Sequence, residues 1–233
     1  MKTAIMQPYF LPYIGYFQLL NAVDRFVFYD DVNYINRGWV NRNRMLINSI
    51  AKHFTIPLLK ASQNKLINEV EIGFQSKEYL KLQKTIEIAY KKAPYFDQVI
   101  KIVKPVLNKD YNNIAEIAIE SVKVCASYLG LKTEFYVSSS DFSNSNDLNR
   151  TERILYICKQ LNTKTYINAI GGIELYKKED FKQQDIELKF IKTLPIKYKQ
   201  FNNEFVPWLS ILDVLMFNSA EEVNEMLDEY ELI

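Results

Sequence analysis

The chain has 233 residues and nearly balanced charge, with 29 lysines and arginines against 28 aspartates and glutamates. This balance argues against a general affinity for nucleic acid or for anionic membranes. The N-terminus lacks the pattern of a secretion signal, and no apolar run is long enough to cross a bilayer. We therefore expect a cytoplasmic protein with no integral membrane association. The length allows one α/β domain or two small ones, and because no composition shift marks a linker we expect a single domain over residues 1–233.

Metal ligands and obvious nucleophiles are scarce. His53 is the only histidine, which excludes sites built from several histidines and weakens a serine-histidine triad. Cys125 and Cys158 fall in predicted helices without metal-ligand spacing, so we interpret them as buried thiols. No metal site is predicted.

The chain opens with a predicted strand, loop, helix and strand. Residues 3–6 are apolar, residues 16–22 have the spacing of an amphipathic helix, and residues 26–29 are typical of a second strand. The connecting loop is stiffened by two prolines and is rich in aromatic residues. Ligands of parallel sheets bind beyond the carboxyl ends of the strands, so this loop is predicted to form one wall of a crevice and residues 30–34, after the second strand, to face it. Its candidate binding residues are Gln7, Pro8, Tyr9, Tyr13, Gly15 and Tyr16.

Two polar segments follow the second strand. Asp30 and Asp31 could hold Mg²⁺, orient a hydroxyl or amine, or act as a general base, and a solvated turn is the alternative. Further on, Arg42, Asn43 and Arg44 come shortly after Trp39. Arginines can grip a phosphate or carboxylate while the indole covers a ring, and ordinary surface arginines are the alternative.

The next elements alternate between β and α patterns. Residues 45–59 predict one or two strands with a hairpin turn at 49–52, and residues 66–72 predict another, so we expect a β-rich insert at about 45–75. Helices are predicted over residues 76–92, 95–106 and 113–129, with Ser76 as an N-cap and Gly130 at the end of the third. Later strands are predicted at 133–137, 165–168 and 186–190, later helices at 148–161 and 220–230, and an apolar helix ending at 217.

Several later residues complete the candidate site. Ser138 begins a polar segment at a strand end, where hydroxyls and exposed amides can bind phosphate. Gly171 and Gly172 are the only adjacent glycines, which suggests a sharp turn or close approach to a ligand. Asp213 stands among apolar residues and, if buried, needs an arginine or amide partner. Strands interleaved with helices predict an α/β fold with a mixed, largely parallel sheet, helices on both faces and the small insert.

Taken in order, these segments resemble the WbqC-like family. The resemblance rests on Gln7-Pro8, Leu11-Pro12, Gly15-Tyr16-Phe17, Asp30-Asp31, Arg42-Asn43-Arg44, the Tyr166 to Gly171-Gly172 to Tyr176 segment, Tyr198 with Gln200, and Leu209-Ser210-Ile211-Leu212-Asp213. It runs along essentially the whole chain. Many members read His-Gln-Pro in the first loop, whereas Met6 replaces that histidine here.

The resemblance implies a transferase of O-antigen or other surface-polysaccharide biosynthesis. It would form an amide between glycine, or another small acyl donor, and the amine of a nucleotide-linked amino sugar. Asp30 would accept the amine proton, Arg42 and Arg44 would hold phosphate or carboxylate, and aromatic residues would cover sugar or base. The alternative is a non-catalytic protein that binds nucleotide sugars in the same pathway. The sugar, the donor and any oligomer are left open.

A second resemblance concerns residues 10–16. The strand, loop and helix are similar to those of nucleotidyltransferases and pantothenate synthetase, with tyrosines in place of the two histidines of that superfamily. This likeness implies a Rossmann-like sheet and gives ATP with Mg²⁺, or an activated acyl donor, as alternative co-substrates. Because tyrosine cannot supply the imidazolium charge, Arg42 and Arg44 would compensate.

Overall fold

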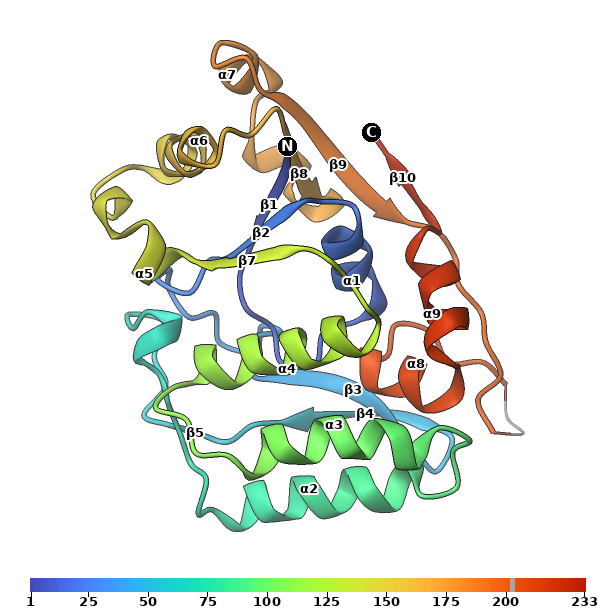
Figure 1. Ribbon diagram of the computed structural model, residues 1–233. Coiled ribbons are helices and arrows are strands. Elements are labelled where there is room, and N and C mark those ends of the chain that lie inside the picture. Colours follow the sequence, from blue (N-terminus) through green and yellow to red (C-terminus); the bar gives the residue numbers. More distant parts are fainter. Residues whose placement is uncertain (202–203) are drawn as a thin grey trace.

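A six-stranded sheet forms the centre of the computed structural model, which describes residues 1–201 and 204–233 (Figure 1). The strands stand in the order β10-β9-β8-β1-β2-β7. Their bounds are β1 Lys2–Met6, β2 Arg25–Phe28, β7 Glu134–Val137, β8 Thr165–Ala169, β9 Glu187–Thr193 and β10 Tyr230–Leu232. Only β10 runs antiparallel to its neighbour. The predicted mixed, largely parallel sheet is confirmed. The helix predicted over residues 220–230 is shorter than expected, because β10 begins at Tyr230.

Strand β1 lies in the middle of the sheet, between β2 and β8. The chain first extends the sheet on one side, through β2 and β7, and then continues on the other side with β8 and β9. The loops that follow β1 and β8 therefore leave the same edge in opposite directions. In open α/β sheets such a reversal creates a crevice at the carboxyl ends of the strands.

Helices cover both faces because successive strand residues point to opposite sides. Ala4 and Phe26 join one core with residues of α1, α4 and α9, while Ile5 and Val27 join a second core with residues of α6 and α7. The bounds are α1 Ile14–Asn21, α4 Ile114–Tyr128, α6 Arg150–Gln160, α7 Lys178–Lys182 and α9 Ala220–Leu227. Predicted caps are confirmed at two positions: the Ser76 hydroxyl accepts from the Tyr79 amide, and Gly130 has φ +72° after α4.

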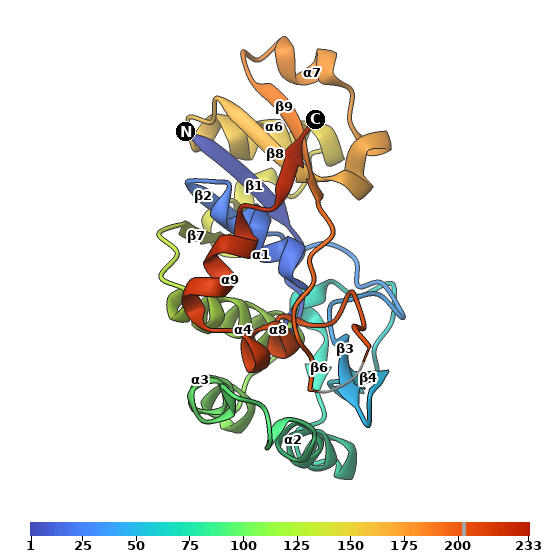
Figure 2. The same cartoon turned by 90° about the vertical axis from the view of Figure 1, so that its right-hand side faces the viewer.

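A second layer lies beside the carboxyl edge of the sheet, where Figures 1 and 2 show β3 and β4 near α2, α3 and α8. Its elements are β3 Arg42–Ile47, β4 Ile50–Thr55, β5 Leu58–Leu59, β6 Glu71–Ile72, α2 Lys77–Tyr90, α3 Phe96–Asn108 and α8 Ile211–Phe217. The β strands of this layer form two separate two-stranded sheets. Whether they constitute an insert in a single domain stays a prediction.

Two local predictions in this layer are wrong. The β3–β4 turn is Asn48-Ser49 rather than residues 49–52, and both turn residues take positive φ values of 49° and 66°. Residues 66–72 do not form one strand, because Ile67–Glu69 is a 3₁₀ turn and only Glu71–Ile72 pairs with β5. The Glu69 carboxylate accepts from the Leu66 amide at 2.8 Å, which favours the turn over an extended strand.

Three short elements complete the chain. They are α5 Ser138–Asp141, η2 Ser143–Ser145 and η3 Ile170–Leu175, the last two being 3₁₀ helices. Among the described residues, no helix has both the length and the apolar character needed to span a membrane.

Candidate functional site

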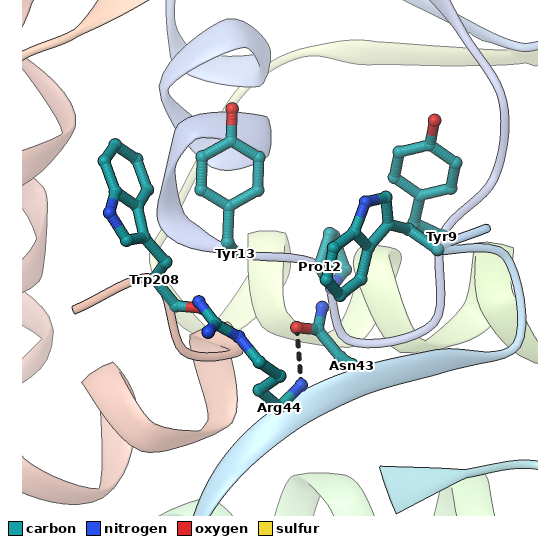
Figure 3. A pocket seen from close by; sticks show the side chains of 7 residues that line it. Tyr9, Pro12, Tyr13, Asn43, Arg44 and Trp208 are labelled. Atoms are coloured by element: carbon teal, nitrogen blue, oxygen red, sulfur yellow. Dashed lines mark hydrogen bonds between the residues drawn. The ribbon is translucent and has the colours of Figure 1, made fainter. Parts of the chain in front are cut away.

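An aromatic cavity of about 410 Å³ lies between the loop after β1 and the start of β3. Its lining residues are Tyr9, Pro12, Tyr13, Trp39, Asn43, Arg44 and Trp208. Five of them, all except Pro12 and Trp208, are candidate residues from the sequence. Figure 3 shows the rings of Tyr13 and Trp208 side by side, with Tyr9 on the other side of the cavity. The structure thus brings together residues from three distant parts of the chain.

The loop after β1 is held in a strained form by hydrogen bonds. Leu11 has φ +43°, a left-handed conformation that costs an L-residue roughly 1–2 kcal/mol. The Leu11 carbonyl accepts from Asn43 Nδ2 at 2.9 Å and from Ser210 Oγ at 2.6 Å, and its amide donates to Ser121 Oγ at 3.0 Å. Asn43 therefore positions the loop as well as lining the cavity.

The remaining candidates of this loop are structural supports. The buried Tyr16 hydroxyl donates to the Gln7 carbonyl at 3.0 Å, and Pro8 is buried. At Gly15, a Cβ atom would lie 2.4 Å from Cε2 of Tyr13 and 2.5 Å from Oγ1 of Thr193. The absent side chain thus leaves room for the Tyr13 ring rather than for a ligand.

Replacement of Gly15 by alanine tests this packing. Alanine normally favours a helix by up to about 1 kcal/mol relative to glycine, but here we expect a loss of about 1–3 kcal/mol because the added methyl group collides with Tyr13 and Thr193. Urea unfolding measures the change. Gly171→Ala is the control, since no atom of residues 1–201 and 204–233 would lie within 4 Å of a Cβ there, and equal stability of the two variants would contradict the prediction.

Arg44 and Trp208 fix one another at the cavity wall. Arg44 Nη2 donates to the Trp208 carbonyl at 2.7 Å, and the Ser210 amide donates to the Arg44 carbonyl at 2.9 Å. Trp208 adopts φ +61° and is 59% exposed, so its ring is held out of the core. Arg44 Nε is buried without a partner among the described residues. Trp208 was not among the candidate residues. Its position directly before the motif at residues 209–213 is the sequence feature that could have indicated it.

The cavity edge carries uncompensated positive charge. Arg42 donates to the carbonyls of Gly38, at 3.0 Å, and of Arg37, and its guanidinium lies 5.8 Å from the Trp39 ring centre. The ion pairs formed by the described residues include neither Arg42 nor Arg44. Desolvation, together with these two arginines, lowers the pKa of His53. An anion is therefore favoured at this edge, although Arg42 itself does not line the cavity.

The cavity is equipped to bind more than to transfer protons. Burial raises the pKa of Tyr9 and of Tyr13, and a hydrogen bond with Thr193 opposes the shift at Tyr13. Both phenols stay protonated near neutral pH and can donate hydrogen bonds. The described lining residues include no carboxylate, imidazole or thiol.

Asp30 lies elsewhere, in a second cavity of about 670 Å³. Its carboxylate accepts from the hydroxyls of Ser138 at 3.0 Å and Ser139 at 2.6 Å, from the Ser139 amide at 3.0 Å, and from Asn68 Nδ2 at 3.3 Å. The Ser138 hydroxyl has one proton and also lies 2.5 Å from Asp31 Oδ1, so the three donors of Ser139 and Asn68 are the ones that Asp30 does not share. Strand β2 pairs with β7 on the side away from β8, so the start of the loop after β2, at Asp30, meets Ser138, whereas Trp39 near the end of the same loop lines the aromatic cavity.

Ser138 is fully buried and joins the two aspartates. Its hydroxyl lies 2.5 Å from Asp31 Oδ1, while Arg153 Nη2 lies 2.5 Å from Asp31 Oδ2. Arg153 is itself buried and stacks over the Tyr29 ring at 4.7 Å. The expected phosphate-binding hydroxyl is thus engaged in a buried charge network.

Tyr198, Gln200 and Asp213 form another buried network. Asp213 accepts from the Tyr198 hydroxyl at 2.7 Å, from Gln200 Nε2 at 2.8 Å and from the Tyr90 hydroxyl at 2.7 Å. The predicted amide partner is confirmed, whereas Tyr90 was missed because it lies more than a hundred residues away in the chain. Burial raises the pKa of Asp213, and the three hydrogen bonds oppose the shift.

The glycine pair and Tyr176 do not line the aromatic cavity. A Cβ on Gly172 would lie 2.9 Å from Asn168 Nδ2, while Gly171 is exposed. Tyr176 packs edge-on against Phe181, with ring centres 5.8 Å apart. Among the described residues, no cluster of three or more histidine, cysteine, aspartate or glutamate side chains is placed to hold a metal ion.

Comparisons with known proteins agree with the motifs. The chain is 28% identical over 230 residues to a protein of Mycobacterium tuberculosis (strain ATCC 25618 / H37Rv) named "Uncharacterized protein Rv1507c", with 97% of each chain covered. No solved structure matches the chain. A sequence profile of the WbqC-like protein family matches residues 7–225. The chain therefore belongs to the WbqC-like protein family.

Proposed function

We propose that this chain is a transferase of surface-polysaccharide biosynthesis that binds a nucleotide-linked amino sugar in the aromatic cavity. The observation that carries the proposal is the pairing of aromatic rings with Arg44, whose buried Nε lacks a partner among the described residues. Aromatic faces stack on bases and sugars, and guanidinium groups bind phosphate. The reaction would join the amine of the sugar to the activated carbonyl of a glycyl or other small acyl donor, with release of AMP from an acyl adenylate or of the thiol from a thioester.

The strand order supports a nucleotide ligand. From β7 to β10 the strands follow the chain order 3-2-1-4-5-6, which is that of Rossmann-like sheets binding nucleotides at the carboxyl edge. A nucleotidyltransferase-like mechanism with ATP and Mg²⁺ is one route to an activated donor. Asp30 is a poor Mg²⁺ ligand for that route, because its carboxylate already accepts hydrogen bonds from Ser139 and Asn68.

A second candidate function is binding without catalysis. It is favoured by the absence of a general base among the described lining residues and by the separation of Asp30 from the cavity. Under the transferase proposal, an activated donor would supply the reactivity, and the protein would contribute orientation and phenolic hydrogen-bond donors. Consumption of the ligand separates the two candidates.

Replacement of Arg44 by alanine tests the binding site. We expect the affinity for a UDP-linked amino sugar to fall about 10–100-fold, because a charge-assisted hydrogen bond is worth about 1.5–3 kcal/mol. Isothermal titration calorimetry measures the affinity. Arg150→Ala, at an exposed arginine far along the chain, should bind like the wild type. Unchanged affinity in Arg44→Ala would place the sugar elsewhere.

Mass spectrometry of the same mixtures tests the reaction. UDP-linked amino sugars are incubated with the protein and with either glycine plus ATP and Mg²⁺ or short acyl-coenzyme A thioesters. A new amide supports the transferase, and its loss in Arg44→Ala ties it to the cavity. Binding without any product supports the second candidate, and a panel of sugars without binding refutes both. Asp30→Asn should leave product formation intact if Asp30 acts only within its buried network.

A further inference from the structure

An apolar chamber of about 740 Å³ lies beside the aromatic cavity. Its lining includes Tyr13 and Ile14, where the loop after β1 enters α1, Ile170 directly after β8, and Thr193 at the end of β9. Strands β1 and β8 are the pair at which the strand order reverses. The chamber therefore occupies the position at which open α/β sheets bind ligands.

The walls of this apolar chamber combine aliphatic and aromatic side chains. The aliphatic ones include Ile170, Leu194, Ile196, Leu209 and Val214, and Phe205 adds an aromatic ring. Its volume is within the range of small-molecule sites, and aliphatic walls suit a flexible apolar chain better than a charged amino acid such as glycine.

Two lysines give one part of the lining a positive charge. Lys192 and Lys197 both line the chamber and are exposed. Lys192 has one acidic partner, Glu231, at 3.8 Å, while Lys197 takes part in no ion pair within residues 1–201 and 204–233. A lysine ammonium binds phosphate as a point charge. A ligand of this chamber thus combines an apolar chain with an anionic end.

Tyr13 and Trp208 separate the chamber from the aromatic cavity. Both residues line both spaces, and their ring centres lie 6.2 Å apart. The Arg44 contact to the Trp208 carbonyl holds this partition from the other side. A ligand in the aromatic cavity and a ligand in the apolar chamber would therefore be separated only by the side chains of Tyr13 and Trp208.

We propose that the apolar chamber binds the second substrate of the protein, an extended and mostly apolar chain that ends in a phosphate. The idea that this ligand is a second substrate rests on the proposed function. The idea that the chamber binds an apolar ligand with a phosphate does not. Two kinds of molecule present an extended chain with a phosphate: prenyl phosphates, whose chain is wholly apolar, and phosphopantetheine thioesters such as coenzyme A derivatives, whose amides could meet Tyr13, Thr193 or Tyr198 of the lining. The chamber is far larger and more apolar than free glycine requires.

Titration calorimetry with butyryl-coenzyme A and with farnesyl phosphate tests the proposal. We expect one of these probes to bind and Ile170→Trp to weaken it at least 10-fold, because an indole there fills part of the chamber. Ile170 is 37% exposed, so the larger ring can be tolerated by the fold. Ile173→Trp is the matched control: Ile173 belongs to the same 3₁₀ turn, is 46% exposed and does not line the chamber.

The anionic end has its own test. Lys197→Ala should weaken the same probe about 3–10-fold, an effect that shrinks as salt is added, while Lys199→Ala should not. Butyryl-coenzyme A as the better ligand identifies a thioester acyl donor, whereas farnesyl phosphate, which has no acyl group, would identify a lipid phosphate and contradict the placement of the acyl donor in this chamber. Failure of both probes to bind, or equal binding by Ile170→Trp and Ile173→Trp, overturns the proposal.

The two proposals can fail separately. Arg44→Ala should lose more affinity for the UDP-linked amino sugar than for the ligand of the apolar chamber, while Ile170→Trp should do the reverse. If only the sugar binds to wild-type protein, the apolar chamber has been assigned wrongly and the proposed function stands. If only butyryl-coenzyme A or farnesyl phosphate binds, the assignment of the apolar chamber is supported and the nucleotide-sugar proposal is wrong.

Discussion

Replacement of Asp213 by alanine is expected to lower the free energy of unfolding by about 3–5 kcal/mol. Asp213 is fully buried and is the acceptor for the donor groups of Tyr90, Tyr198 and Gln200. Alanine would leave three donors without an acceptor and would open a small cavity. Such a loss is a large share of the about 5–15 kcal/mol that stabilises a typical domain. Urea unfolding followed by circular dichroism measures it.

The conservative variant Asp213→Asn provides the control. Asparagine keeps the volume and one acceptor oxygen, so Tyr198 and Gln200 retain their partner while the bond from Tyr90 is lost or reversed. We expect a smaller loss, about 1–3 kcal/mol. Equal effects of alanine and asparagine would show that the hydrogen bonds of Asp213 contribute little.

The pH dependence follows from the raised pKa of Asp213. Burial lifts this pKa above its ordinary value near 3.8, so the folded chain takes up a proton at a pH where the unfolded chain has not. Protonation therefore stabilises the wild type as the pH falls from 7 towards 4, and this contribution is lost as the pH rises through the folded-state pKa. Asp213→Asn lacks this group. The stability difference between the two proteins should widen at acid pH, and a difference that narrows would contradict the assigned direction.

The Asp213 network also supports both ligand spaces. Gln200 donates to the Val206 carbonyl at 3.1 Å and accepts from the Val206 amide at 2.7 Å, two residues before Trp208. Tyr198 itself lines the apolar chamber. Loss of Asp213 would therefore free the segment that carries the partition between the two spaces, and binding would weaken together with stability.

The sequence predicted what depends on local pattern. Strand alternation located β1, β2, β7, β8 and β9 within a few residues, and turn chemistry located the Ser76 and Gly130 caps. The aromatic loop after β1 was recognisable because an excess of prolines and aromatic residues at a strand end has few structural explanations. Local pattern failed at residues 66–72, where a capping carboxylate outweighed β propensity.

The sequence did not predict the order of the strands in the sheet, and this order decides which strand ends are neighbours. Asp30 was expected opposite the aromatic loop, but strand order sends it to Ser138 and Ser139, which are over a hundred residues away. Trp208 reaches the aromatic cavity only because α8 packs beside β3, a contact between distant segments. Arg153 and Tyr90 were missed for the same reason, since their acidic partners are set by tertiary packing.

Replacement of Arg153 by methionine is expected to cost about 3–5 kcal/mol of stability, because it leaves a buried charge without its partner. Asp31 and Arg153 are both buried, and their closest atoms lie 2.5 Å apart. Arg153 also donates to Ser145 Oγ at 3.0 Å and to Asn146 Oδ1 at 2.8 Å, which fixes its orientation. Lys104→Met is the control, because its pair with Glu87 is exposed and such pairs contribute about 0–1 kcal/mol.

A double-mutant cycle separates the ion pair from the packing of Arg153. Asp31→Asn removes the charge that Arg153→Met strands, so the double variant should be more stable than Arg153→Met alone, with a coupling energy of about 1–3 kcal/mol. Additive losses would show that Arg153 stabilises the fold through its stacking on Tyr29 instead. Because Asp31 shares the Ser138 hydroxyl with Asp30, disruption should also loosen the second cavity. Sugar binding in the aromatic cavity should persist in the folded fraction, since neither residue lines it.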